Sequence, residues 1–146
     1  MRFYLKMGLN GKFRPIFLYI EEKDNTMLLK GKNVLIIEDN ENDMKIAETH
    51  LKSLKAKVFK CVTGENALET FKKKNIELVI IDYRLPYKNG LMITNEMKSI
   101  KEIPIILVSG IDEVIQDVDY VKKFKFDDII CKPYHKADLL KAIESL

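Results

Sequence analysis

The chain has 146 residues, of which 47% are hydrophobic and 32% charged, the size and composition of one folded globular domain rather than of a disordered segment. Its formal net charge of +3 resides in residues 1–30, and residues 31–146 carry 19 charges of each sign, so the body lacks the basic excess of nucleic-acid-binding proteins. No apolar run reaches the roughly 20 residues that cross a bilayer, and we recognise neither signal peptide nor anchor, so we expect no membrane contact. Two cysteines without a disulfide framework or a C-x-x-C pair indicate a cytoplasmic protein.

The first 30 residues do not share the pattern of the rest of the chain. Residues 2–7 and 12–20 flank Asn10-Gly11, a strong short-range hairpin signal, which makes a β-ribbon plausible. The segment is equally compatible with a remnant of an upstream domain, or with a start codon assigned too early, in which case Met27 is the natural start. These readings stay open, and we divide the chain into an extension, 1–30, and a domain, 31–146.

Short β-branched apolar runs alternate with amphipathic stretches of about a dozen residues from residue 32 onward, a pattern typical of βα units around a parallel sheet. Five strands are predicted, at residues 33–37, 57–62, 78–81, 105–108 and 128–131. Three of them are almost entirely apolar, as strands covered by helices on both faces have to be.

Apolar residues at helical spacing predict a helix after each strand. The positions are Met44, Ile46, Ala47, Leu51 and Leu54, then Ala67, Leu68 and Phe71, then Leu91, Ile93, Met97 and Ile100, then Val114, Ile115, Val118 and Val121, and finally Leu139, Leu140 and Ile143. The predicted fold is α/β, a flavodoxin-like (βα)5 doubly wound parallel sheet of strand order 2-1-3-4-5 with an N-terminal extension.

Polar side chains stand where the predicted strands end. Glu38 and Asp39 follow the first strand, Asp82 the third, Ser109 the fourth and Lys132 the fifth. Since the carboxyl ends of parallel strands meet at one edge of a sheet, folding should bring all five together.

Each of these residues, taken singly, has a structural explanation. Asp39 or its neighbour Asn40 could cap the first helix, and Asp82 could open a turn. Lys132 could be a surface charge. Three carboxylates converging on one cleft would however repel one another and have raised pKa values unless a cation lay between them. Because hard oxygen ligands suit Mg²⁺, we expect a magnesium site here.

Four segments then point to a family. They are Val-Leu-Ile-Ile-Glu-Asp-Asn at residues 34–40, Leu-Val-Ile-Ile-Asp-Tyr-Arg-Leu-Pro at 78–86 with the following Asn89-Gly90, Ile-Leu-Val-Ser-Gly at 106–110, and Cys131-Lys132-Pro133. In order and spacing they resemble the response regulator receiver domains of two-component phosphorelays, the chemotaxis regulators among them. The resemblance covers residues 32–146 and implies a phosphoacceptor that receives its phosphoryl group from a histidine kinase or a phosphotransfer protein.

The resemblance implies three catalytic residues. Asp82 would be the nucleophile that becomes an acyl phosphate, Lys132 would supply positive charge to the phosphate oxygens, and Ser109 would donate a hydroxyl hydrogen bond. The Lys132-Pro133 bond is implied to be cis. Such a domain catalyses its own phosphorylation and dephosphorylation, and we expect no enzymatic activity on other substrates.

Mg²⁺ is the cofactor that the resemblance implies. Asp39, Asp82 and the backbone carbonyl of Arg84 would be its ligands, and Glu38 would hold a metal-bound water. Arg84 and Ile111 occupy positions that flank the acyl phosphate and, in the family, influence its hydrolysis.

The last predicted strand departs from the family pattern. Ile129 stands three residues before the lysine, where the family has Tyr or Phe, and Lys125-Phe126 replace a small Gly-Ala pair. Strand alternation would place Phe126 on the opposite side from Ile129. We expect unaltered phosphoryl chemistry but a changed relay to the surface formed by the fourth helix, fifth strand and fifth helix, through which a downstream protein or a second copy would bind.

Three other interpretations compete with this one. A Mg²⁺-dependent phosphatase resembling the haloacid dehalogenase class needs a second Asp two residues after the nucleophile, where Arg84 stands. An FMN-binding module needs donors after the first strand, where Glu41 and Asp43 add to the acidic pair and repel phosphate. A receiver segment of a hybrid histidine kinase stays open. Because the sequence stops soon after the fifth helix, we expect no output domain, and hence a stand-alone receiver or a fragment.

The remaining reactive residue types have structural readings. Cys61 and Cys131 are predicted on strands at opposite edges of the sheet, too far apart for a disulfide. His50 shares a face of the first helix with apolar residues and is read as structural, and His135 is read as a surface residue.

Overall fold

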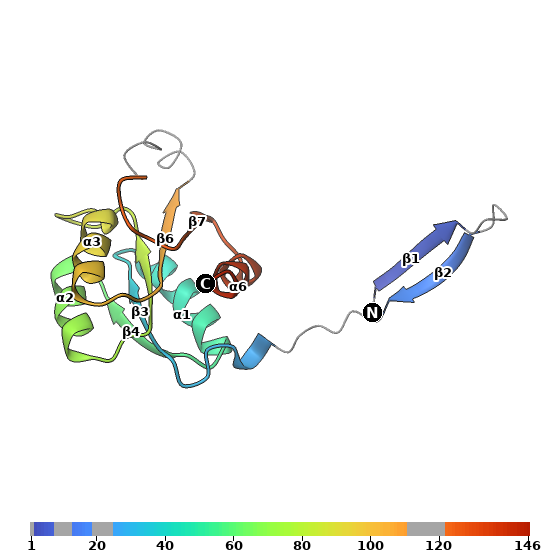
Figure 1. Cartoon of the computed structure of the whole chain (residues 1–146), viewed down its shortest axis with the longest axis horizontal. Coiled ribbons are helices and arrows are strands. Elements are labelled where there is room, and N and C mark those ends of the chain that lie inside the picture. The colour runs from blue at the N-terminus through green and yellow to red at the C-terminus, as the bar shows by residue number, and fades with distance from the viewer. Residues whose placement is uncertain (1, 8–12, 19–24, 111–121) are drawn as a thin grey trace.

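The structure, a computed structural model, describes residues 2–7, 13–18, 25–110 and 122–146 (Figure 1). Five parallel strands form one sheet in the order β4-β3-β5-β6-β7, which confirms the predicted order 2-1-3-4-5. The strands are β3 (Asn33–Ile37), β4 (Lys57–Cys61), β5 (Leu78–Asp82), β6 (Ile105–Gly110) and β7 (Asp128–Lys132).

Three strands continue beyond their apolar runs into the polar residues that follow. Asp82 is the last residue of β5, Gly110 of β6 and Lys132 of β7. In the parallel register Asp82 pairs with Val108, and Gly110 pairs with Lys132. The sheet therefore fixes these backbone positions side by side at its carboxyl edge.

The helices stand at the places that the apolar spacing predicted. They are α1 (Glu41–Ser53), α2 (Gly64–Lys73), α3 (Gly90–Ile100) and α6 (Lys136–Glu144), and a short 3-10 helix, η1 (Asn25–Met27), precedes the sheet. The helix predicted from Val114, Ile115, Val118 and Val121 lies outside the described residues, as does Ile111.

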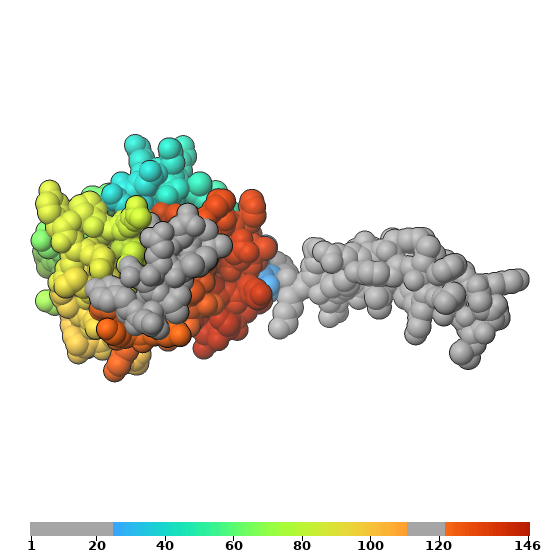
Figure 2. Space-filling view, turned by 90° about the horizontal axis from the view of Figure 1, so that it is seen from above, coloured from blue at the N-terminus to red at the C-terminus, as the bar shows by residue number. Residues whose placement is uncertain are grey.

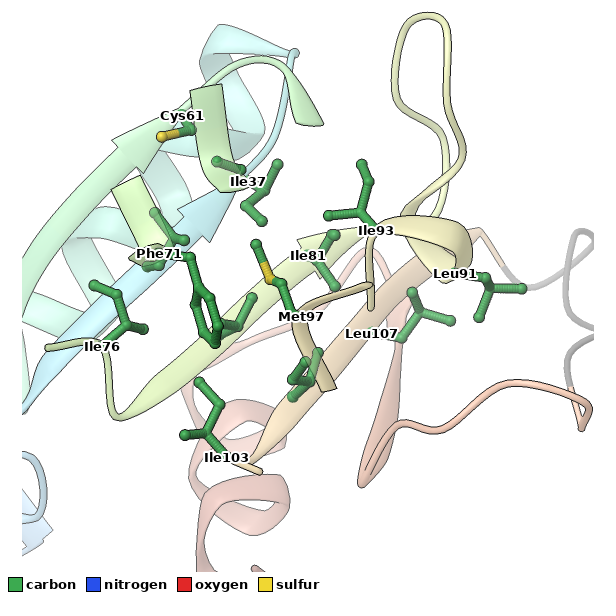
Figure 3. Packing of buried hydrophobic residues seen from close by; sticks show 14 residues of the cluster. Ile37, Cys61, Phe71, Ile76, Ile81, Leu91, Ile93, Met97, Ile103 and Leu107 are labelled. Atoms are coloured by element: carbon green, nitrogen blue, oxygen red, sulfur yellow. The ribbon is translucent and has the colours of Figure 1, made fainter. Parts of the chain in front are cut away.

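Alternate residues of the central strands belong to two hydrophobic cores, one on each face of the sheet. The α2/α3 core joins Leu35, Ile37, Val79, Ile81, Ile105 and Leu107 to Ala67, Phe71, Leu91, Ile93 and Met97 of the two helices (Figure 3). The α1/α6 core joins Val34, Ile36, Leu78, Ile80, Ile106 and Val108 to Met44, Ala47, Leu51, Leu139 and Ala142. Burying one Leu or Ile side chain contributes about 1.5–3 kcal/mol, so the strands that carry the polar edge are firmly held.

Phe126 packs differently from the prediction. Phe126 and Ile129 are both partly buried against the α2/α3 core, so the two residues contact the same side of the sheet. The prediction was wrong because Phe126 precedes β7, which begins at Asp128, and strand alternation does not extend to residues outside the strand.

A separate β-ribbon forms near the N-terminus, the arrangement that the Asn10-Gly11 signal made plausible. Strands β1 (Arg2–Met7) and β2 (Phe13–Leu18) pair antiparallel in a sheet of their own, from Arg2 opposite Leu18 to Met7 opposite Phe13. The Asn10-Gly11 turn lies outside the described residues.

Two further expectations concern the helices and the cysteines. In the part of the chain that the structure describes, no helix is both long and apolar enough to cross a bilayer. Cys61 and Cys131 are free and lie on β4 and β7, the two edge strands, as predicted.

Candidate functional site

The carboxyl edge of the sheet brings together most of the polar residues that the sequence singled out. Glu38 and Asp39 follow β3, Asp82 ends β5 and Lys132 ends β7. Figure 2 is seen from above relative to Figure 1 and shows α1 in cyan, the segment after β5 in yellow-green and the chain after residue 122 in orange and red.

Three carboxylates converge at this edge. Glu38, Asp39 and Asp82 each offer an oxygen, and these oxygens all lie within 4.8 Å of one another. Glu38 and Asp82 are buried, whereas Asp39 is exposed. Hard oxygen donors at this spacing, one of them open to solvent, fit a Mg²⁺ ion that keeps some of its water ligands.

Asn40 is the residue that caps α1. Its side-chain oxygen accepts hydrogen bonds from the backbone N–H groups of Asn42 at 3.0 Å and Asp43 at 3.1 Å. Its own backbone N–H donates to Glu38 Oε1 at 3.0 Å. Because Asn40 satisfies the helix end, Asp39 is not the cap, and its carboxylate is left to the acidic group.

Lys132 connects the acidic residues. Its Nζ donates hydrogen bonds to Glu38 Oε2 at 2.7 Å, to Asp82 Oδ2 at 2.8 Å and to Asp43 Oδ2 at 2.8 Å. The side chain is 21% exposed, so the ammonium group is only partly solvated. Lys132 is therefore part of the site and not the surface charge of the simpler reading.

Asp43 contacts Lys132, and the sequence analysis did not predict this contact. The available signal was its position, since it lies in the first turn of the helix that follows β3 and thus at the same edge as the strand ends. Its carboxylate is 37% exposed and lies nearer the rim than those of Glu38 and Asp82.

The described side chains place four carboxylates, those of Glu38, Asp39, Asp43 and Asp82, around the ammonium group of Lys132. Burial, together with the nearby charge of Asp82, raises the pKa of Glu38 to about 7, although hydrogen bonds from Lys132 and Asn40 act in the opposite direction. Burial alone would lower the pKa of Lys132, but hydrogen bonds to Asp43, Asp82 and Glu38 raise it above its usual value. An additional cation would stabilise this arrangement.

Asp82 also shapes the loop that follows it. Its Oδ1 accepts a hydrogen bond from the backbone N–H of Arg84 at 3.1 Å, so the turn reading is correct for one oxygen while the other contacts Lys132. The backbone N–H of Gly90 donates to the carbonyl of Tyr83 at 2.8 Å and closes the loop. The Lys132-Pro133 bond is cis, as the resemblance implied.

Ser109 lies at the same edge but deeper. It is fully buried in β6, one residue beyond the position that pairs with Asp82. Its hydroxyl donates a hydrogen bond to the carbonyl oxygen of Gly110 at 3.2 Å. Its backbone position thus brings the hydroxyl to the edge where Asp82 ends.

The two histidines lie where the simple readings put them. His50 on α1 is half-buried, with its ring centroid 6.1 Å from that of Tyr134, and burial lowers its pKa. His135 is exposed at the start of α6.

Comparisons with known proteins agree with this geometry. A family model described as "Response regulator receiver domain" matches residues 34–144. The probable transcriptional regulator ycf27 of Cyanidium caldarium is 31% identical over 127 residues, covering 87% of this chain and 49% of the relative. The regulatory protein VanR of Enterococcus faecium is 30% identical over 112 residues, covering 77% of this chain and 48% of that relative. The chain spans about half the length of these curated relatives.

Solved structures share the fold. The receiver domain of a sensor histidine kinase from Pseudomonas aeruginosa PAO1, with a magnesium ion coordinated in its active-site cleft, has a TM-score of 0.70 at 25% identity over 78% of this chain and 95% of that chain. A response regulator receiver domain protein from Clostridium thermocellum has a TM-score of 0.69 at 22% identity over 77% of this chain and 91% of that chain.

Proposed function

Because this chain belongs to the family of response regulator receiver domains, we propose that it accepts a phosphoryl group on Asp82 and signals by the conformational change that follows. The observation that carries the proposal is the environment of Asp82. Its side chain is only 8% exposed, its Oδ2 lies 2.8 Å from Lys132 Nζ, and oxygens of Glu38 and Asp39 converge with it. The contact of Oδ1 with the N–H of Arg84 accounts for only one oxygen of Asp82, and a buried, crowded carboxylate whose other oxygen meets Lys132 suits a nucleophile.

The chemistry is a phosphoryl transfer to a carboxylate. An oxygen of Asp82 attacks the phosphorus atom in line, a P–O bond forms, and the bond from phosphorus to the donor breaks, so that the leaving group departs with the electron pair. Lys132 supplies positive charge, and Ser109 a hydroxyl donor, to the oxygens of the transferred group. Hydrolysis of the acyl phosphate returns Asp82 to its starting state.

Glu38, Asp39 and Asp82, with the backbone carbonyl of Arg84, are the residues that would hold Mg²⁺, Glu38 through a bound water. When bound, Mg²⁺ supplies positive charge that neutralises the oxygens of the phosphoryl group during transfer. The close spacing of hard carboxylate oxygens supports this assignment.

The partners follow from the same chemistry. The donor is a histidine kinase or a phosphotransfer protein, and the domain acts as no enzyme on other substrates. The response passes to a downstream partner, or to a second copy, through the surface of β7, α6 and the helix that the sequence predicts before β7. The longer relatives named as transcriptional regulators support a downstream role of this kind.

Acetyl phosphate provides a test without the cognate kinase. We expect the wild-type protein, with Mg²⁺, to gain the mass of one phosphoryl group, and the Asp82→Asn variant to gain none, because the amide lacks the nucleophilic oxygen. Intact-mass spectrometry measures both. Hydroxylamine should remove the group from the wild type, since it cleaves acyl phosphates.

Two controls make the result specific. The Glu41→Gln variant loses one negative charge near the site, and should be phosphorylated like the wild type because Glu41 is an exposed residue of α1. Chelation of Mg²⁺ should stop the reaction. An Asp82→Asn variant that gains a hydroxylamine-sensitive group at the wild-type rate would show that another residue is the phosphoacceptor.

A further inference from the structure

The ammonium group of Lys132 has three N–H donors, and it donates hydrogen bonds to three carboxylates. Two of these carboxylates belong to the proposed metal site. Lys132 Nζ lies 2.7 Å from Glu38 Oε2 and 2.8 Å from Asp82 Oδ2. Its third partner is Asp43, whose Oδ2 is 2.8 Å away. Asp43 does not belong to the converging group of Glu38, Asp39 and Asp82 that the described part of the chain contains.

Asp43 is held in place independently of Lys132. It is the third residue of α1, and its backbone N–H donates a hydrogen bond to the capping oxygen of Asn40 at 3.1 Å. Its negative charge in the first helical turn is stabilised by the helix dipole. Its side chain is 37% exposed, against 7% for Glu38 and 8% for Asp82, so the carboxylate lies at the rim of the site.

The ammonium group and a divalent cation would compete for the same two carboxylates, Glu38 and Asp82, whose other oxygens already accept backbone N–H groups. Two cations within bonding distance of one carboxylate oxygen repel each other strongly in a partly buried site. A cation bound by Glu38 and Asp82 therefore weakens the contacts of Lys132 to both residues. Asp43 is the one carboxylate of its three partners that Lys132 then retains.

We propose that Asp43 is a positioning residue, which draws the ammonium group of Lys132 away from the metal-binding oxygens and holds it at the rim, facing the phosphoryl group on Asp82. This inference rests on the proposed function. Without the charge of Asp43, Lys132 remains on Glu38 and Asp82 and opposes the cation. If a cation nevertheless displaces Lys132 in the absence of this charge, nothing holds its ammonium group within reach of the phosphate oxygens.

The first measurement is the dissociation constant for Mg²⁺ alone, obtained from backbone amide NMR shifts as the ion is titrated into the protein. We expect Asp43→Asn to raise the dissociation constant about three- to tenfold, the effect of losing one charge-assisted contact. Glu41→Gln is the matched control, because it removes the same charge from the same turn of α1 at a residue that is not among the three partners of Lys132. Its effect should stay within about twofold.

A double-mutant cycle distinguishes a role through Lys132 from a direct effect on the cation. Lys132→Met keeps the length of the side chain and removes the competing charge, so it should tighten Mg²⁺ binding. In that background, Asp43→Asn should change the affinity by no more than Glu41→Gln does. A second measurement needs no Lys132 variant: at saturating Mg²⁺, Asp43→Asn should still slow phosphorylation by acetyl phosphate about three- to tenfold.

Each outcome decides between the two proposals. Equal behaviour of Asp43→Asn and Glu41→Gln in both measurements would overturn the role of Asp43 and leave the proposed function standing. An undiminished effect of Asp43→Asn in the Lys132→Met background would assign Asp43 to the cation directly and also overturn it. A wild-type protein that neither binds Mg²⁺ nor accepts phosphate would overturn both.

Discussion

The backbone N–H of Gly90 donates to the carbonyl of Tyr83, and this contact brings the start of α3 against the end of β5. A Cβ atom at Gly90 would lie 2.1 Å from the carbonyl oxygen of Asp82 and 3.2 Å from the Cα of Tyr83. These are backbone atoms, which cannot rotate out of the way. The absence of a side chain at Gly90 is therefore a condition for the position of Asp82.

We predict that Gly90→Ala lowers the free energy of unfolding by about 1–3 kcal/mol, the usual cost of inserting a methyl group where the structure has no room. The same shift of the backbone should displace Asp82 and slow its phosphorylation by acetyl phosphate. Urea denaturation and the initial rate of phosphorylation measure the two effects.

Gly64→Ala is the matched control, at the first residue of α2. There an added Cβ would lie 2.2 Å from Cδ1 and 2.9 Å from Cγ1 of Ile93, which are side-chain atoms of the α2/α3 core and not the backbone that carries Asp82. We expect a smaller loss of stability than for Gly90→Ala and an unchanged rate of phosphorylation. Equal losses in both variants would mean that the close approach to Asp82 has no special role.

At the scale of elements, β7 is where this chain departs from the family pattern. In related domains an aromatic ring at the position of Ile129 fills the space that the hydroxyl at the Ser109 position vacates when it moves toward the phosphate. Ile129 has a short side chain that is stiff about χ1, so it transmits little volume change. Phe126, which packs on the same α2/α3 core, is the nearest aromatic residue in sequence that contacts this side of the sheet.

We predict that Mg²⁺ and beryllofluoride, a mimic of the phosphoryl group, shift the backbone amide NMR signals strongly beside Asp82, Ser109 and Lys132 and weakly at residues 129–131 and along α6. The reason is that position 129 has no aromatic ring that could transmit the conformational change from Ser109 to β7 and α6. Phe126→Leu is the control for the aromatic residue nearest to Ile129 in sequence that packs on this core. Shifts along β7 and α6 as large as those beside Asp82 would contradict the prediction, and their loss in Phe126→Leu would assign the relay to Phe126.

At the scale of the whole molecule, the N-terminal ribbon is separate from the sheet that carries the site. Among the described residues, strands β1 and β2 pair only with each other, and the first core residue whose burial the structure describes is Leu29. Backbone hydrogen bonds hold the segment from Leu29 onward against the domain, since the N–H of Leu29 donates to the carbonyl of Leu54 at 3.1 Å and that of Gly31 to the carbonyl of Lys55 at 3.3 Å.

We predict that a protein beginning at Met27 folds and is phosphorylated at the wild-type rate, because it retains both cores and all site residues. The hydrogen bonds that it loses in the described part of the chain include the exposed one from Asn25 Nδ2 to Glu144 Oε1 at 2.7 Å and that from the N–H of Leu28 to the carbonyl of Asn25 at 3.1 Å, each of which contributes little in water. Scanning calorimetry and acetyl phosphate test the two parts. Aggregation, or a fall in melting temperature beyond about 8 °C, equivalent to more than roughly 1–2 kcal/mol, would show that the extension supports the domain.

The sequence by itself determined the layered architecture and the location of the site. The apolar runs at 34–37, 78–81 and 105–108 are long enough and continuous enough to require a helix layer on both faces, and this decides the sheet type. Once the sheet is parallel, Glu38, Asp39, Asp82, Ser109 and Lys132 must share its carboxyl edge, whatever the details of packing. These features depend on local pattern and on topology alone.

Only the tertiary structure decided which side chains touch. Asp43 and Lys132 are 89 residues apart, and their contact depends on how α1 is rotated against the end of β7. The packing of Phe126 on the same core as Ile129 depends on where β7 begins, and the choice of Asn40 over Asp39 as the helix cap depends on one turn of backbone. Such contacts are set by helix rotation, strand limits and packing, which the periodicity of a sequence does not specify.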